Sequence, residues 1–109
     1  MTTSEVAQMV AEVGVPYAYY QFTNDTAQPC PFICFYFTDS DDMSADNTNY
    51  AKVRRLIIEL YTDNKDFDME DATETVLNSH GLFYSKTEVY IDTERMYEVI
   101  YESEVILNG

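Results

Sequence analysis

The sequence has few of the residues from which phosphate-binding and catalytic sites are built. Its 109 residues include no tryptophan, three glycines, three prolines, two cysteines and one histidine. Loops that cradle phosphate groups need closely spaced glycines, and the chain contains no GxGxxG, P-loop or HExxH pattern. We therefore expect no enzyme activity, with no catalytic residues, no cofactor and no metal site.

Basic residues are also scarce. Six lysines and arginines face twenty aspartates and glutamates, which gives a formal net charge of −14. Such a charge repels DNA, RNA and anionic lipid, so direct binding to nucleic acid or to a membrane surface is not expected. Three of the basic residues, Lys52, Arg54 and Arg55, lie just before the apolar stretch 56–61. We predict that this cluster contacts another protein subunit; the alternative is that it is solvated at a strand edge, where it discourages aggregation.

The two cysteines do not indicate a disulfide or a metal site. In an extended strand, Cys30 and Cys34 would lie about 13 Å apart, whereas a disulfide needs Cα atoms closer than about 7 Å. No set of histidine, cysteine or carboxylate residues with ligand spacing accompanies them. We expect buried, reduced thiols.

The acidic stretch that begins at Asp39 does not match a calcium-binding loop. Counting Asp39 as the first position puts Ser44 where glycine belongs and Tyr50 where glutamate belongs. A solvated loop is the prediction, and a weak cation site is the alternative. The single histidine, His80, precedes Gly81 at the end of a predicted helix, where a cation complements the helix dipole.

Hydrophobic periodicity predicts an α+β fold. Apolar residues recur at helical spacing near the N-terminus and again before Gly81, whereas the other apolar stretches are short and rich in aromatic and β-branched residues. Short connections favour a mostly antiparallel sheet of about four to five strands, with two helices packed on one face. The polar interval 38–50 is expected to be a long, mobile connection. The expected elements, in the order α-β-β-β-α-β-β, are a helix from Thr2 or Ser4 to Gly14, strands over 17–22, 32–37 and 51–62, a helix from Asp66 or Asp68 to Gly81, and strands over 83–91 and from 96 to 101 or beyond.

Several predicted strands are apolar on both faces, which two helices on one face do not explain. Ile57 and Tyr61 are expected to face away from the core. A second apolar face in so short a chain indicates self-association or a protein partner. The alternative is that its tyrosines lie on a solvated face with their hydroxyl groups in water. On the core side, the expected residues are Leu56, Ile58 and Leu60 of the third strand and Met69, Ala72, Val76 and Leu77 of the second helix.

The chain also lacks membrane and export signals. No apolar run approaches the roughly 18 residues needed to span a bilayer, and the N-terminal residues do not form a signal peptide pattern. We expect a soluble, cytoplasmic protein.

Five stretches together resemble small tail-completion proteins of siphophages and prophages of Gram-positive bacteria. The similarity covers nearly the whole chain, and its motifs are structural rather than catalytic. It implies that residues 1–109 form a single tail-completion-like domain. The stretches are PYAYYQF (16–22), PFICFY (31–36), IELYTDNKD (58–66), YSKTEVYID (84–92) and MYEVIY (96–101).

The resemblance implies a non-enzymatic structural protein at the phage head–tail junction, either a tail terminator or a tail-to-head joining protein. Such proteins form a ring, typically of six subunits, that caps the tail tube, meets the head connector and lets DNA pass. The implied partners are further copies of the chain, the major tail tube protein and the head connector or completion protein. The chain would lie in the host cytoplasm during assembly, where it can remain a monomer, and then at the head–tail junction of the virion.

Two sets of residues are the predicted contacts. Cyclic subunits meet through different patches, so a basic patch on one must meet an acidic patch on the next. The predicted subunit interface is Lys52, Arg54, Arg55, Ile57 and Tyr61, and the predicted loop that contacts the neighbouring ring includes Asp39, Asp41, Asp42, Asp46 and Asn47.

Two other functions remain open at this point. An acidic nucleic-acid mimic would occupy the basic groove of a host DNA-binding enzyme, but this reading depends on charge alone, and the carboxylates are spread over predicted helices, turns and loops. The remaining alternative is a soluble oligomeric domain with no role in a virion.

Overall fold

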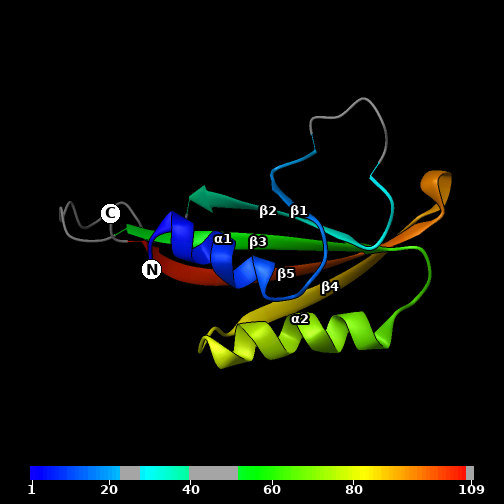
Figure 1. Ribbon diagram of the computed structural model, residues 1–109. Coiled ribbons are helices and arrows are strands. Elements are labelled where there is room, and N and C mark those ends of the chain that lie inside the picture. The colour runs from blue at the N-terminus through cyan, green and yellow to red at the C-terminus, as the bar shows by residue number, and fades with distance from the viewer. Residues whose placement is uncertain (23–27, 40–51, 108–109) are drawn as a thin grey trace.

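The computed structural model describes residues 1–22, 28–39 and 52–107, and its elements follow the order α-β-β-β-α-β-β (Figure 1). The predicted α+β fold is therefore confirmed. A 3-10 turn over Asp92–Glu94 joins the last two strands. The helices are α1 (Thr3–Ala11) and α2 (Phe67–Ser79), and the strands are β1 (Tyr17–Tyr19), β2 (Phe32–Asp39), β3 (Lys52–Thr62), β4 (Tyr84–Ile91) and β5 (Met96–Leu107).

The strands form one sheet in the order β1-β2-β3-β5-β4. Three neighbouring pairs are antiparallel and only β1 runs parallel to its neighbour β2, so the sheet is mostly antiparallel as predicted. β3 is the central strand, and β5 pairs with it from Lys52 opposite Leu107 to Thr62 opposite Tyr97. β4 follows α2 in the chain but lies outside β5, which makes it an edge strand of the sheet.

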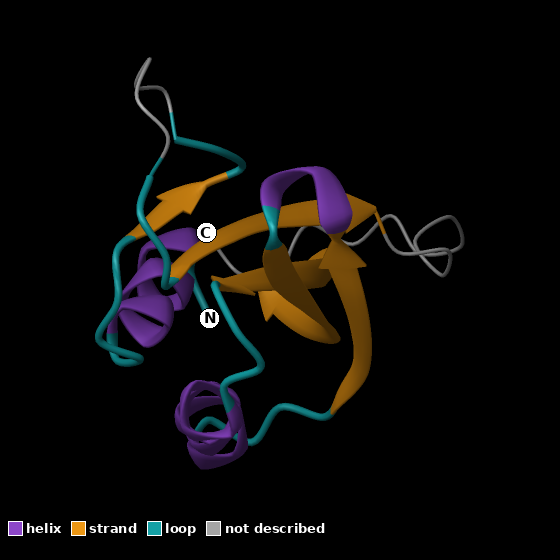
Figure 2. Cartoon of the chain, turned by 90° about the vertical axis from the view of Figure 1, so that its right-hand side faces the viewer, coloured by secondary structure: helices purple, strands orange, loops and turns teal. Residues whose placement is uncertain are grey.

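Both helices pack against the same face of the sheet (Figures 1 and 2). Val6, Met9 and Val10 of α1 are at most 1% exposed, which is the stripe that helical spacing predicts. They share one buried cluster with Leu77 of α2 and with alternate residues of β2, β3 and β5. The predicted core residues Leu56, Ile58 and Leu60 belong to this cluster.

Local hydrogen bonds fix the start of α1. The side chain of Thr2 accepts a hydrogen bond from the backbone N–H of Glu5 at 3.1 Å, and the Glu5 carboxylate accepts one from the N–H of Thr2 at 2.8 Å. This reciprocal pair is a capping box, which satisfies two donors that the first helical turn leaves without partners. Beyond the helix, Gly14 has φ +93°, a conformation that suits glycine and turns the chain toward β1.

The buried stripe of α2 differs from the prediction. Its N-cap is Asp66, whose side chain accepts a hydrogen bond from the N–H of Met69 at 3.1 Å, within the predicted starting range. The helix does not bury a purely apolar stripe, because the sheet under it carries charged partners for polar side chains. Its buried residues are Glu70, Thr73 and Leu77, while Met69, Ala72 and Val76 are only partly buried.

Two predicted boundaries also differ. The strand predicted over 17–22 ends at Tyr19, because Tyr20 takes the left-handed conformation with φ +72°. The last strand, predicted to reach 101 or beyond, continues to Leu107, so the apolar tail is part of the sheet. Thr38 and Asp39, predicted as the start of a long connection, belong to β2, and the rest of that connection lies outside the described residues.

None of the helices in the described ranges combines the length and the apolar character that crossing a membrane requires.

Candidate functional site

Strand alternation separates two of the basic residues that are neighbours in the sequence. Arg54 is opposite Val105, which belongs to the core, so Arg54 lies on the helix side of the sheet. Arg55 is one residue further along and lies on the other face, together with Ile57 and Tyr61. The structure therefore brings Arg55, Ile57 and Tyr61 of the predicted interface to one face and places Arg54 on the opposite one.

The remaining predicted contact residues are not described in full. Lys52 begins β3 and Asp39 ends β2, but their side chains lie outside the description. Asp41, Asp42, Asp46 and Asn47 lie in the segment 40–51, which is outside the described residues. The contact proposed for that loop stays a prediction.

We call the sheet face opposite α1 and α2 the open face, because no described helix packs against it (Figure 2). Its centre is nonetheless well covered by neighbouring side chains, since Ile57 is 5% exposed and Cys34 is 6% exposed. Toward β4 and the end of β5 the apolar residues are open, with Val89 at 41% and Ile106 at 57% exposed. The central residues of the open face are Cys34, Tyr36, Arg55, Ile57, Glu59, Tyr61, Glu98 and Ile100.

Two tyrosines and two glutamates form a hydrogen-bond cluster at the centre of the open face. The hydroxyl of Tyr36 donates to Glu59 Oε2 at 3.3 Å. The hydroxyl of Tyr61 lies 3.0 Å from Glu59 Oε1 and 3.1 Å from Glu98 Oε2. These tyrosine hydroxyls are therefore bound to carboxyl groups of the same face, an arrangement that the sequence did not predict.

Glu98 is an unusual carboxyl group within this cluster. Burial raises its pKa, the hydrogen bond with Tyr61 works against that rise, and the nearby Glu59 raises it further. The net pKa of Glu98 lies above its ordinary value. Because Tyr61 has one hydroxyl proton and two carboxyl neighbours, a proton on Glu98 allows both contacts to be hydrogen bonds.

The thiol of Cys34 lies beside the same carboxyl groups. Both cysteines are free, and Cys34 is buried whereas Cys30 is only partly buried. Burial, followed by the charges of Glu59 and Glu98, raises the pKa of Cys34 to about 11. The thiol is therefore protonated and a weak nucleophile at neutral pH.

Two hollows adjoin the open face. One, of about 400 Å³, has a largely aromatic lining, in which the rings of Phe32 and Tyr61 stack with centroids 4.7 Å apart. The other, of about 490 Å³, lies beside Arg55 and next to Phe83. The aromatic hollow suits an apolar or aromatic side chain of a partner, whereas the lining of the other also includes the charged residues Arg55, Glu102 and Glu104. The first is lined by Tyr20, Phe22, Phe32, Cys34, Tyr61 and Met96 among others.

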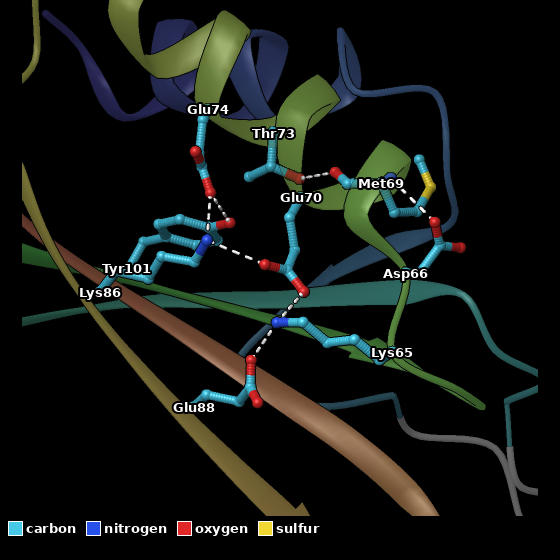
Figure 3. Close-up of polar contacts among 9 residues, drawn as sticks. All are labelled: Lys65, Asp66, Met69, Glu70, Thr73, Glu74, Lys86, Glu88 and Tyr101. Atoms are coloured by element: carbon cyan, nitrogen blue, oxygen red, sulfur yellow. Dashed lines mark hydrogen bonds and ion pairs between the residues drawn. The ribbon is translucent and has the colours of Figure 1, made fainter.

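A second polar cluster joins α2 to the sheet on the helix side (Figure 3). Its central residue is Glu70, whose side chain is 4% exposed and lies 2.7 Å from Lys65 Nζ and 2.8 Å from Lys86 Nζ. Burial alone would raise the pKa of Glu70, but the hydrogen bonds from Lys65 and Lys86 overcome it and hold the pKa below its ordinary value. Glu70 is therefore an ionised, buried and paired carboxylate.

The outer members of this cluster extend it across α2, β4 and β5. Lys86 Nζ lies 2.7 Å from Glu74, which also accepts a hydrogen bond from the hydroxyl of Tyr101 at 2.9 Å. Lys65 also pairs with Glu88 of β4. The hydrogen bonds that Lys86 donates to Glu70 and Glu74 raise its pKa. Two ammonium groups thus bridge three carboxylates, and the cluster anchors α2 to the sheet.

The sequence contained one signal for this cluster. Glu70, Thr73 and Leu77 recur at the spacing of one helical face, which would have placed a carboxylate on the buried side of α2. Its partners come from residue 65 and from β4, and no local pattern relates them to Glu70. Only the folded arrangement of the strands brings these partners next to Glu70.

His80, the single histidine of the sequence, lies at the end of α2. His80 is the C-cap of α2, and its Nε2 lies 3.1 Å from a carboxylate oxygen of Glu12. This ties the end of α2 to the end of α1. Within the described ranges, no three histidine, cysteine or carboxylate side chains gather so as to hold a metal ion.

Comparison with known proteins gives a structural similarity only. No protein-family model matches the chain, and a search of curated proteins gives no match. Among solved structures, the fold is similar to that of a chain in the virion of a native gene transfer agent particle, with a TM-score of 0.59 and 15% sequence identity. The similarity covers 94% of this chain and 86% of that chain, so the two share a fold over almost their full lengths.

Proposed function

We propose that the chain is a non-enzymatic structural protein of a phage virion, placed at the head–tail junction, where it forms or joins a ring that ends the tail tube and lets DNA pass. The observation that carries this proposal is the fold shared with a virion chain along 94% of the sequence. The resemblance of five sequence stretches to tail-completion proteins supports the same role independently of the fold.

The charge of the chain fits a passage for DNA. With a net charge of −14, the surface offers few sites at which phosphates could be held. DNA that moves through a ring must not bind to its wall, and an acidic wall meets that requirement. The proposed partners are further copies of the chain, the tail tube protein and the head connector.

The open face supplies the proposed subunit contact. It combines a cation, Arg55, with the covered apolar side chain of Ile57 and the ring of Tyr61, and an aromatic hollow adjoins it. Tyrosine and arginine side chains are enriched at protein interfaces, and the open face presents both. Arg54 lies on the other face, so it would contact a different neighbour or a different part of the same neighbour.

Charge reversal tests the interface in phage particles that carry this chain. We expect Arg54→Glu combined with Arg55→Glu to block the joining of tails to heads, because like charges at an interface are repelled. Electron microscopy would show separate heads and tails, and infectivity would fall. Arg95→Glu, at an exposed arginine in the turn before β5, matches the charge change of each single reversal and should assemble normally.

The outcomes separate the function from the interface. Normal virions from the double variant would overturn the assignment of the basic residues while leaving the function in place. Absence of the chain from purified, complete virions would overturn the proposed function itself. Comparison of Arg54→Glu with Arg55→Glu then shows which face of the sheet makes the contact.

A further inference from the structure

The outer edge of β4 is a strand edge without cover. β4 is the last strand of the sheet order, and in the described part of the chain no strand pairs with its outer side. All six residues from 85 to 90 are exposed, including Val89 at 41% and Tyr90 at 47%. The neighbouring Phe83 is 93% exposed. An edge of this length offers a row of backbone donors and acceptors to another strand.

The sequence of β4 is self-complementary when two copies pair antiparallel. A two-fold axis between two antiparallel edge strands is perpendicular to the sheet, so paired side chains must lie on the same face. This condition is met only when the axis passes between the two copies of one residue, so that this residue lies opposite itself; we call this residue the centre of the register. Centring on Lys86 or on Glu88 places like charges directly opposite each other, which destabilises a strand pair.

Centring on Thr87 removes this conflict. Lys86 then lies opposite Glu88 of the second copy at two symmetric positions, and Thr87 lies opposite itself. Ser85 lies opposite Val89, and the aromatic pair of Tyr84 and Tyr90 forms at both ends of the strand. One residue further, the exposed Phe83 lies opposite Ile91.

The charged residues remain available for this pairing. Lys86 and Glu88 keep 37% and 41% of their side-chain surface exposed. The contacts of Lys86 to Glu70 and Glu74 use two of the three donors of its ammonium group. Glu88 meets Lys65 through Oε1, and its second oxygen can accept from the Lys86 of the other copy.

We propose that β4 pairs antiparallel with β4 of a second copy, in the register centred on Thr87, and that this pairing gives a two-fold dimer with a continuous ten-stranded sheet. The dimer covers Phe83 and Val89 and leaves α2 of both copies on one side of the sheet. It differs from the open-face contact and does not depend on the proposed function. A dimer of this kind protects the edge strand of the free protein against random strand addition.

Cysteine cross-linking tests the register. In this arrangement Thr87→Cys places two thiols on directly opposite residues, so mild oxidation should give a covalent dimer on a non-reducing gel. Ser85→Cys and Val89→Cys should not cross-link alone, but a mixture of the two should, because residue 85 faces residue 89. Wild-type protein is the control for the native Cys30 and Cys34. Equal cross-linking of all three variants, or none by Thr87→Cys, would overturn the register.

Mass measurement tests the dimer itself without new cysteines. We expect light scattering after size exclusion to give twice the chain mass for wild type and the single mass for Thr87→Lys, which places two lysines face to face at the axis. Thr75→Lys adds the same charge on the exposed side of α2 and should remain dimeric. A wild-type monomer at all concentrations, or a Thr87→Lys dimer, would overturn the proposal. Circular dichroism of each variant confirms that the fold is retained.

Discussion

At the scale of single residues, the two carboxyl groups Glu70 and Glu98 show how neighbours set charge. Glu70 is buried and Glu98 is partly buried, which by itself favours the protonated form of each. Glu70 lies between two ammonium groups, and its pKa falls below the ordinary value. Glu98 has a tyrosine and another carboxylate as neighbours, and its pKa rises. The neighbouring groups therefore shift the pKa values of these two carboxyl groups in opposite directions, although burial alone would raise both.

Replacement of Glu70 tests the anchoring of α2. Glu70→Gln leaves Lys65 and Lys86 without their shared partner, and we expect a loss of about 2 kcal/mol at neutral pH, below the value for fully buried pairs because both lysines retain solvent contact. Urea unfolding measures it. Asp71→Asn removes the same charge from the exposed side of α2 and should change stability little. An equal loss in both variants would contradict a specific role for Glu70.

The pH dependence of this loss has a defined sign. The folded-state pKa of Glu70 is lowered, so its contribution is present above the unfolded-state pKa of about 4.3 and is lost as pH falls through the folded value. The stability difference between wild type and Glu70→Gln should therefore shrink progressively below about pH 4. A difference that stays constant through this range would show that packing, not charge, causes the loss.

At the scale of elements, α1 depends on its first turn. The helix is short, and helices of this length gain little from propensity alone, so its capping box and its buried stripe determine whether it forms. The capping threonine can be changed without touching the core.

Thr2→Ala tests this dependence. The change removes the acceptor for the Glu5 N–H, and we expect a loss of about 1 kcal/mol in the free energy of unfolding. Denaturant unfolding measures it, with Thr3→Ala at the next, exposed position as the matched control. An effect of Thr3→Ala as large as that of Thr2→Ala would contradict the capping role.

Sequence patterns predicted elements better than they predicted contacts. The helical spacing of Val6, Met9 and Val10 and the cap at Thr2 are local, so α1 was predictable. The polar contact between α2 and the sheet was not predictable, because Glu70 can be buried there only when Lys86 from β4 pairs with it.

For the candidate site, alternation along β3 places Arg54 and Arg55 on opposite faces, although their proximity in the sequence had grouped them. The cluster of Tyr61, Glu59 and Glu98 depends on the pairing of β3 with β5, which no local pattern contains.

At the scale of the whole molecule, the dominant property is its negative field. A protein that neutralises phosphates must supply cations, and this chain has six against twenty acidic residues. Within the described residues, Lys65 and Lys86 are already paired with carboxylates, which reduces the basic surface further.

A gel-shift assay tests this consequence. We expect the isolated protein to leave the mobility of double-stranded DNA unchanged even at about 20 mM salt, where electrostatic binding is strongest. A basic DNA-binding protein at the same concentration shows that the assay detects such binding. Salt-sensitive retention of DNA by this chain would contradict the proposed passive passage and would direct attention to Arg54 and Arg55.

The position of β3 at the centre of the sheet has a consequence for how the chain folds. The pairs β4–β5 and β2–β3 each consist of strands that are consecutive in the sequence. The central pair β3–β5 is different, because α2 and β4 lie between its two strands along the chain and Lys52 is opposite Leu107. Closing such a distant pair costs chain entropy before its contacts form, which slows folding. Until that step, the apolar surfaces of β3 and β5 remain open to other nascent chains. The residues of β3 therefore affect how fast the chain folds as well as how stable the folded sheet is.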